Sequence, residues 1–407
     1  MSRLNVDALH SEDGGSSNIE LDDSRNTTCK GNLTVDGNIS VTGTGLTDTK
    51  SFRNILINGA SLISQNNGTT SVSGEGQLAD MWKVSTTASA NSAVMQVVND
   101  GPVGFQYSQK ITMGGSTWSP AAGNICYIQQ NIEAGNAAQL AFGTSDAKTV
   151  TLSFWVKASQ TGEYSVALTN NTSAYVHDNA DRNYITSYTI SSANTWERKS
   201  VTIAGDTSGT WAKTGVGSGM ACVWDFGSGT NHEASTGSWQ AGADFRKAGT
   251  VGLGAVASAT WQITGAQLEV GSSMTDFEHI PIVDEAVRCY RYYWTAENNT
   301  TVESTAFPSG VVFIRSASTV RWLPTFPIQM RSRPSITGTG VFRVYDGSNV
   351  NTFTIGSSGT CTGENISKWS SIVSFSDGAG SDLTLGRAGQ LYGDGTNAAK
   401  VTFDASL

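Results

Sequence analysis

The stretch Thr149-Val-Thr-Leu-Ser-Phe-Trp-Val-Lys157 decides the fold class of this chain. Every second side chain in it is apolar, and these side chains share one face of an extended segment: Val150, Leu152, Phe154 and Val156. A period of two predicts a β-strand with one buried face, because a helix would need apolar residues three and four positions apart.

Further strand patterns follow this stretch, and Gly, Ser and Asn fill the segments between them. The sequence predicts strands at 196–203, 251–256 and 260–270, the last with Trp261 and Ile263 on one face and a bulge at Gly265. Residues 204–248 are predicted to form a long Gly/Ser-rich loop. Strands at this spacing predict an all-β chain with a central β-sandwich.

The composition of the 407 residues agrees with short strands joined by turns. Charged residues make up 14%, against about 25% in an average protein, and there are 45 Gly but only 7 Pro. Hydrophobic residues make up 38% and include 11 Trp, which is enough for real cores and excludes a disordered chain.

Charge and cysteine content narrow the choice of partners. A net charge of −9 without a local cluster of Lys or Arg argues against nucleic acid, and no apolar stretch is long enough for membrane insertion. Residues 1–15 lack the apolar segment of a secretory signal. The five cysteines are widely spaced and form no metal-binding pair: Cys29, Cys126, Cys222, Cys289 and Cys361. This pattern predicts reduced thiols, folding in a cytoplasm and no cofactor.

Residues 1–50 contain a tandem repeat, in which Gly31–Asp36 is followed by Gly37–Thr42 with the same alternation of apolar side chains. A unit of this size cannot bury its apolar face alone, so it needs copies of itself or other chains beside it. The repeat therefore predicts a short fibre-like β segment shared by several chains, and an ordinary β-hairpin is the alternative.

Beyond the sandwich the sequence predicts one helix and then strands again. The helix is expected from Ile282 to Trp294, after Pro281. Strand patterns follow at 310–314, 342–345, 371–375 and 399–407. The expected organisation is an N-terminal segment, a sandwich, a linking helix and a C-terminal β-sandwich, with the bounds 1–50, 51–280, 281–298 and 299–407.

Several segments, in the same order along the chain, resemble bacteriophage tail-fibre proteins. They are Arg53-Asn-Ile-Leu-Ile-Asn-Gly-Ala60, Ala79-Asp-Met-Trp-Lys83, Ile263-Thr-Gly-Ala-Gln-Leu-Glu-Val-Gly271, Asp276-Phe-Glu-His-Ile-Pro281, Val283-Asp-Glu-Ala-Val-Arg-Cys-Tyr-Arg-Tyr-Tyr-Trp294 and Phe326-Pro-Ile-Gln-Met-Arg-Ser-Arg-Pro-Ser335. Ile280 and Val287 depart from the family pattern, at packing or linker positions.

The resemblance implies a tail-fibre or receptor-binding subunit of the virion, a homotrimer assembled in the host cytoplasm. Its jelly-roll domain would be like a carbohydrate-binding module and would bind a host-surface polysaccharide during adsorption. Residues 1–50 would attach to the phage tail or to an adaptor protein. A structural virion protein without a receptor contact, such as an adaptor or head fibre, is the alternative.

Tryptophans in the 204–248 segment are the sugar-binding candidates: Trp211, Trp224 and Trp239. The apolar face of an indole suits the C–H face of a sugar, and the indole N–H can donate one hydrogen bond. The alternative is that these side chains fill the sandwich core or a contact between copies of the chain.

Acidic residues offer a further candidate site. Asp178 and Asp181 lie in a compact polar segment and would suit Ca²⁺, with a solvated turn as the alternative. A glycosidase needs two facing carboxylates, and no spacing singles out a pair among Asp178, Asp181, Asp206, Asp225, Glu233 and Asp244. We therefore expect a protein that binds glycan without cleaving it, and a glycan depolymerase is the less favoured alternative.

Overall fold

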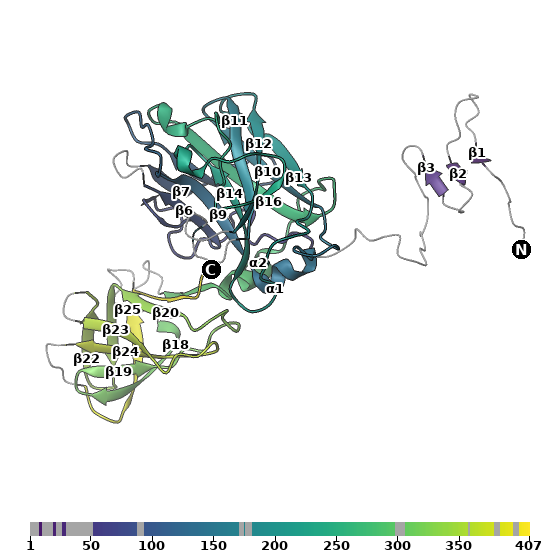
Figure 1. Ribbon diagram of the computed structural model, residues 1–407. Coiled ribbons are helices and arrows are strands. Elements are labelled where there is room, and N and C mark those ends of the chain that lie inside the picture. The colour runs from purple at the N-terminus through teal and green to yellow at the C-terminus, as the bar shows by residue number, and fades with distance from the viewer. Residues whose placement is uncertain are drawn as a thin grey trace, which may run out of the picture. The chain divides into compact units, whose positions relative to one another are not determined.

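The structure is a computed structural model that describes residues 8–9, 19–21, 27–29, 52–87, 93–170, 175, 181–297, 306–356, 359–377, 383–393 and 399–407. By its internal contacts the chain forms two compact units, residues 1–51 and residues 52–407 (Figure 1). In the first unit β1 (Ala8–Leu9), β2 (Ile19–Leu21) and β3 (Thr27–Cys29) form an antiparallel sheet in that order. The repeat at 31–42 lies outside the described residues.

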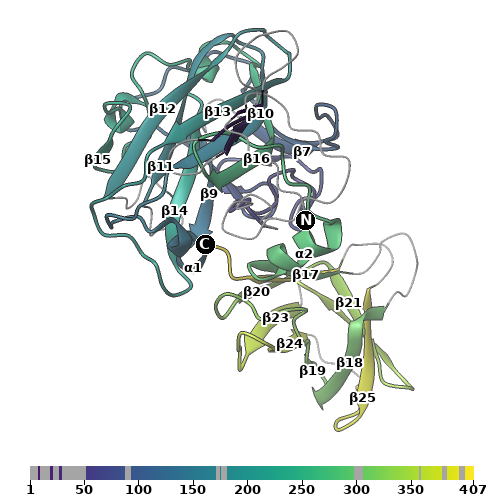
Figure 2. The ribbon, with the colours of Figure 1, turned by 90° about the vertical axis from the view of Figure 1, so that its right-hand side faces the viewer.

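The second unit begins with a β-sandwich, whose two sheets face each other in Figure 2. One sheet has the strand order β13-β10-β16-β8-β7-β4, and the other has the order β15-β12-β11-β14-β9-β6-β5. The strands are β4 (Val72–Ser73), β5 (Gly76–Gln77), β6 (Trp82–Thr86), β7 (Val94–Val98), β8 (Ser108–Thr112), β9 (Cys126–Glu133), β10 (Val150–Ala158), β11 (Gly162–Thr169), β12 (Arg182–Ile190), β13 (Glu197–Ile203), β14 (Ser218–Asp225), β15 (Trp239–Ala241) and β16 (Thr260–Val270). A short helix, α1 (Ala134–Ala137), follows β9.

The sandwich core is built from the strand faces that the alternation predicts. Val150, Leu152, Phe154 and Val156 are all fully buried. Phe154 crosses to the other sheet, where its ring lies edge-on to that of Trp224, with centroids 5.6 Å apart. The register between β10 and β16 shifts at Gly265, which has a φ of 59°, so the predicted bulge is confirmed.

Helix α2 (Ile282–Tyr290) leads into a C-terminal β-domain with a core of its own. Its sheets have the orders β17-β26-β20 and β22-β21-β25-β18-β19-β24-β23. The strands are β17 (Tyr293–Glu297), β18 (Ala306–Ser316), β19 (Thr319–Trp322), β20 (Ser335–Thr339), β21 (Val341–Tyr345), β22 (Val350–Thr354), β23 (Gly359–Glu364), β24 (Ile372–Asp377), β25 (Ala388–Gly393) and β26 (Lys400–Asp404). The all-β fold class with a central β-sandwich is confirmed, and no helix in the described ranges is long and apolar enough to cross a membrane.

Three local predictions are wrong. The helix ends at Tyr290 instead of Trp294, because Tyr293 and Trp294 begin β17 and pair with β26. Residues 251–256 contain a 3₁₀ turn at Leu253–Ala255 in place of a strand. Residues 204–248 are not an unbroken loop, because they contain β14, a fully buried strand in the interior of its sheet.

Three of the segments that carry the sequence resemblance, residues 53–60, 263–271 and 276–281, meet in space and close the sandwich. Asn54, which is 3% exposed, donates a hydrogen bond from Nδ2 to the Ala266 carbonyl (3.1 Å). Its Oδ1 accepts hydrogen bonds from the backbone N–H groups of Leu56 and Leu268, both at 3.1 Å. Glu278 accepts further hydrogen bonds from the backbone of this opening segment. These motifs therefore have a structural role, and they identify no ligand.

Candidate functional site

The first of the candidate tryptophans, Trp224, belongs to the sandwich core. It is fully buried in β14, and its ring centroid lies 5.4 Å from that of Trp82. Cys222 and Met220, two and four residues before it, belong to the same core. An indole enclosed on all sides offers no surface to a sugar. Trp224 therefore fills the sandwich core, which was the alternative to sugar binding in the sequence analysis.

Trp211 and Trp239 lie together at the end of the sandwich where β14 begins. Their ring centroids are 5.3 Å apart at an angle of 89°, and Phe142 packs edge-on against both. Trp211 Nε1 donates to Asp206 Oδ2 (3.1 Å), and Trp239 Nε1 donates to the Ala204 carbonyl (2.7 Å). Trp211 is buried and Trp239 half-buried. Because both N–H donors are used inside the protein, the cluster chiefly anchors the 204–217 segment.

An ion pair strengthens this anchor. Arg182 donates to both carboxylate oxygens of Asp206, at 2.8 Å each. Burial raises the pKa of Asp206, but the hydrogen bonds from Arg182, Ser208 and Trp211 lower it more. The pKa of Asp206 is therefore below its ordinary value, and its carboxylate stays ionised. Asp206 thus acts as an ion-paired structural group.

The structure describes one of the two proposed Ca²⁺ ligands. Asp178 lies outside the described residues. Asp181 is exposed, and its backbone N–H donates to Asn170 Oδ1 (2.8 Å). No group of three or more His, Cys, Asp or Glu side chains is placed to hold a metal ion in the part of the chain that the structure describes. Ca²⁺ binding stays a prediction.

Two further carboxylates of this region share one arginine. Arg246 pairs with Asp225 at 2.5 Å and with Glu233 at 3.1 Å. Asp225 also accepts hydrogen bonds from the backbone N–H groups of Gly227 and Ser228, both at 2.9 Å. These contacts fix the turn that leaves β14.

An open groove of about 340 Å³ lies at the other end of the sandwich, where β14 ends and β9 begins. Two loops far apart in the sequence, one before β9 and one before β16, form its walls together with a residue of the turn after β14. The lining residues are Thr117, Trp118, Ser119, Pro120, Gly227, Gly252, Gly254 and Ala255. We call this the Trp118 groove.

Close contact between backbone and indole shapes the Trp118 groove. The Trp118 backbone N–H donates to the Gly254 carbonyl (2.7 Å), and a Cβ added to Gly254 would lie only 2.8 Å from Trp118 Cε3. A Cβ on Gly227 would lie 2.7 Å from the Gly252 Cα. Glycine at these positions therefore lets the loops approach and leaves a half-buried indole beside a floor of bare backbone.

The groove offers the groups that recognise a sugar. The indole and the Pro120 ring are apolar surfaces for C–H faces, while the hydroxyls of Thr117 and Ser119 can donate and accept hydrogen bonds. None of the residues that line this groove has an ionisable side chain, so the groove suits an uncharged ligand. Trp118 was not among the sequence candidates. The usable signal was the Gly-Leu-Gly run at 252–254, since glycines in a strand pattern often mark close backbone approach.

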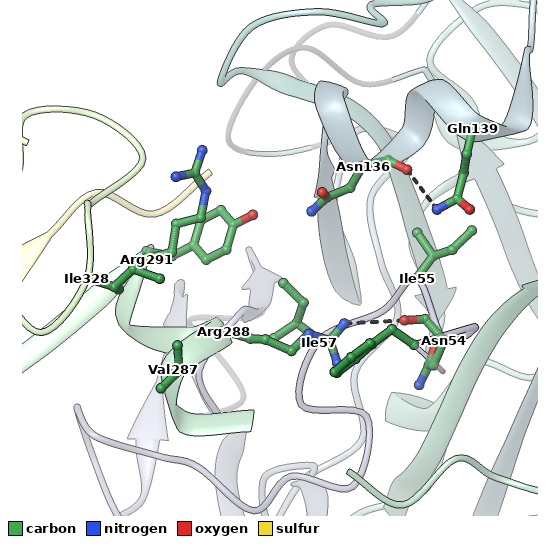
Figure 3. Close-up of a pocket in the computed structure, with 11 residues that line it drawn as sticks. Asn54, Ile55, Ile57, Asn136, Gln139, Val287, Arg288, Arg291 and Ile328 are labelled. Atoms are coloured by element: carbon green, nitrogen blue, oxygen red, sulfur yellow. Dashed lines mark hydrogen bonds between the residues drawn. The ribbon is translucent and has the colours of Figure 1, made fainter. Parts of the chain in front are cut away.

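A second cleft, of about 360 Å³, lies beside α2 (Figure 3). Its lining residues come from the start of the sandwich, the α1 region, α2 and one loop of the C-terminal β-domain: Phe52, Asn54, Ile55, Ile57, Asn136, Gln139, Val287, Arg288, Arg291, Tyr292 and Ile328. Arg288 is paired with Glu285 at 3.3 Å, and Arg291 with Glu133 at 2.6 Å. The cleft therefore presents apolar walls and three amide side chains, of which Asn136 and Gln139 are exposed, and both of its arginines are ion-paired.

Comparison with known proteins finds only partial likeness. No family model matches the chain, and no curated protein matches it. The enzymatically active domain of tailspike protein 4 of bacteriophage CBA120 is similar at 12% identity and a TM-score of 0.28, over 54% of this chain and 22% of that chain. A CBM4 structure is similar at 14% identity and a TM-score of 0.27, over 53% of this chain and 98% of that chain. The family 11 carbohydrate-binding module from Clostridium thermocellum, in complex with a β-1,3-1,4-mixed-linked tetrasaccharide, is similar at 12% identity and a TM-score of 0.24. The match covers 52% of this chain and 91% of that chain. At such low identities and TM-scores, these likenesses carry no argument about what this chain binds.

Proposed function

We propose that this chain is a subunit of a bacteriophage tail fibre in the virion, and that it binds an uncharged host-surface polysaccharide through the Trp118 groove. The observation that carries the proposal is the groove itself, in which an indole stands beside a glycine floor with hydroxyl groups and without ionisable side chains. The resemblance of residues 53–335 to tail-fibre proteins supplies the biological setting.

In this proposal residues 1–50 attach the subunit to the tail or to an adaptor protein, and three copies of the chain assemble together. A groove of about 340 Å³ is near the small end for ligand sites and can hold only a short stretch of glycan. The affinity of one groove is then modest, and several copies engaging one cell surface would raise it by avidity.

The proposal is tested by titrating the purified chain with soluble fragments of host polysaccharide in a calorimeter. Replacing Trp118 by Ala removes the apolar wall, so we expect affinity to fall at least about tenfold, or about 1.4 kcal/mol. The matched control is Trp369→Ala, because Trp369 is 57% exposed and belongs to the C-terminal β-domain. This control should bind like the wild type.

Other outcomes point to other functions. If Trp239→Ala abolishes binding while Trp118→Ala does not, the glycan site is the aromatic cluster at the other end. If the wild type binds no host polysaccharide, the structural virion protein is favoured. We expect binding without cleavage, so release of reducing sugar from the polysaccharide would contradict this part of the proposal.

A further inference from the structure

Two of the three charged residues of helix α2, Glu285 and Arg288, lie on its inward side. Glu285 is 6% exposed and accepts a hydrogen bond from the Asn58 backbone N–H. Arg288 pairs with Glu285 and also donates to the carbonyls of Asn54 and Leu56, at 3.2 Å each. The charged side of the helix therefore holds the opening segment of the sandwich in place.

The outward side of the same helix is apolar. Ile282, Val283 and Val287 are 58%, 68% and 39% exposed, and Val283 and Val287 lie one turn apart on one face. Phe52, which is 60% exposed, lines the same cleft as Val287. We call Phe52, Ile282, Val283 and Val287 the α2 face. A surface helix normally buries its apolar side, and a contiguous apolar patch in water marks a contact surface.

The groups beside the α2 face favour a second copy of this chain as its partner. Arg288 and Arg291 are both ion-paired, so the cleft directs no unbalanced cation toward an anionic lipid or an acidic peptide. The amides on the opposite wall belong to Asn136 and Gln139, which are both exposed (Figure 3). An amide both donates and accepts, so it can bond to its own copy across a symmetry axis, whereas like charges would repel.

Net charge points to the same partner. The chain carries −9, so copies repel one another over most of their surface, and they approach at least cost where the surface is apolar. Asp284, an exposed carboxylate next to Val283, marks the edge of this apolar area. In addition, Phe52 is the first residue of the second unit, so it follows directly on the segment whose repeat at 31–42 needs copies of itself.

We propose that the α2 face is a contact surface between copies of this chain. The inference rests on the assembly of several copies in the proposed function, and it names the residues that meet. It also explains why the apolar side of α2 faces outward, since this side would be buried only in the assembly.

The test uses the full-length chain with Val283→Lys and Val287→Lys together. Its mass is measured by sedimentation over a range of concentrations, and amide exchange in α2 is measured by mass spectrometry. The matched control is Val350→Lys, because Val350 is 54% exposed on β22, in the C-terminal β-domain. We expect the wild type and the control to associate alike, and the α2 variant to need at least about tenfold more protein to associate, or to exchange its α2 amides faster.

An α2 variant that matches the wild type in both mass and exchange would overturn the inference, as would a wild type that is monomeric at every concentration. Binding of a soluble glycan fragment to the Trp118 groove is measured on the same samples. Because that binding needs one copy only, it should be equal in the wild type and the α2 variant. Failure of the contact surface and failure of the glycan site are therefore seen separately.

Discussion

The guanidinium of Arg291, just after α2, donates two hydrogen bonds to the carboxylate of Glu133 at the end of β9, from Nε to Oε2 at 2.8 Å and from Nη2 to Oε1 at 2.6 Å. The Tyr292 hydroxyl donates to the same carboxylate at 2.6 Å. Burial raises the pKa of Glu133, but these hydrogen bonds and the nearby positive charge lower it more. This joint fastens the sandwich to the C-terminal β-domain, whose first strand starts at Tyr293.

Glu133→Gln should lower the free energy of unfolding by about 1–3 kcal/mol at neutral pH, because it leaves the Arg291 guanidinium without its counter-ion in a partly buried place. The folded pKa of Glu133 lies below the unfolded one, so its stabilisation is present above the unfolded pKa and is lost as the pH falls through the folded pKa. Urea unfolding measures both effects. The control is Glu163→Gln, since the Glu163–Lys247 pair is 38% and 33% exposed and should contribute about 1 kcal/mol or less. Equal losses in both variants would contradict the special role of Glu133.

Asp80 should make the protein less stable as the pH rises through about 6. Burial raises its pKa from 3.8 to about 6, although hydrogen bonds from Gln65 and the charge of Lys400 oppose the shift. The folded state therefore favours the protonated acid, and ionisation costs up to about 3 kcal/mol at neutral pH. Urea unfolding of the wild type and of Asp80→Asn at pH values on either side of 6 tests this. The wild type should lose stability relative to the variant on going to the higher pH, and a constant difference would show that Asp80 does not titrate in this range.

Asn54→Ala should lower the free energy of unfolding by roughly 3 kcal/mol or more, because it leaves two backbone N–H groups and one carbonyl unpaired in a buried place. Calorimetry should show a lower melting temperature. Asn231→Ala removes an exposed amide and should change the stability by about 0.5 kcal/mol or less. If both variants melt alike, Asn54 does not hold the sandwich closed.

Gly254→Ala should weaken glycan binding by about tenfold without unfolding the protein, because the new methyl group would lie 2.8 Å from Trp118 Cε3 and move the indole. Tryptophan fluorescence measures the movement of the indole, and calorimetric titration measures the loss of glycan affinity. In Gly123→Ala the methyl group would meet Asn231 Nδ2 at an ordinary 3.7 Å, so affinity should be unchanged. Full affinity in Gly254→Ala would show that the position of the indole is unimportant.

Local patterns were sufficient to predict the strands that bury one face. The alternation of Val150, Leu152, Phe154 and Val156 predicted β10, and Gly265 predicted the bulge in β16. Both signals lie within a few residues of the feature they predict. The start of α2 at Ile282, after Pro281, was predictable for the same reason.

Features that depend on distant partners could not be predicted in this way. Tyr293 and Trp294 continue the helical pattern of α2, but pairing with β26, about a hundred residues later, makes them a strand. The apolar run of β14 is flanked by Gly and Ser on both sides, which hid the strand and placed Trp224 among the loop candidates. The Trp118 groove joins two loops that only the folded sandwich brings together.

The position of β16 has a consequence for how the protein is made. It is the last strand of the sandwich in the sequence, yet it lies between β10 and β8 in its sheet. While a ribosome adds residues 159–270, at about 5–20 per second, the nascent chain holds β8 and β10 with open edges for on the order of ten seconds. An open edge can pair with a strand of another chain, so release of the chain before β16 is made would leave two partial sheets prone to aggregation.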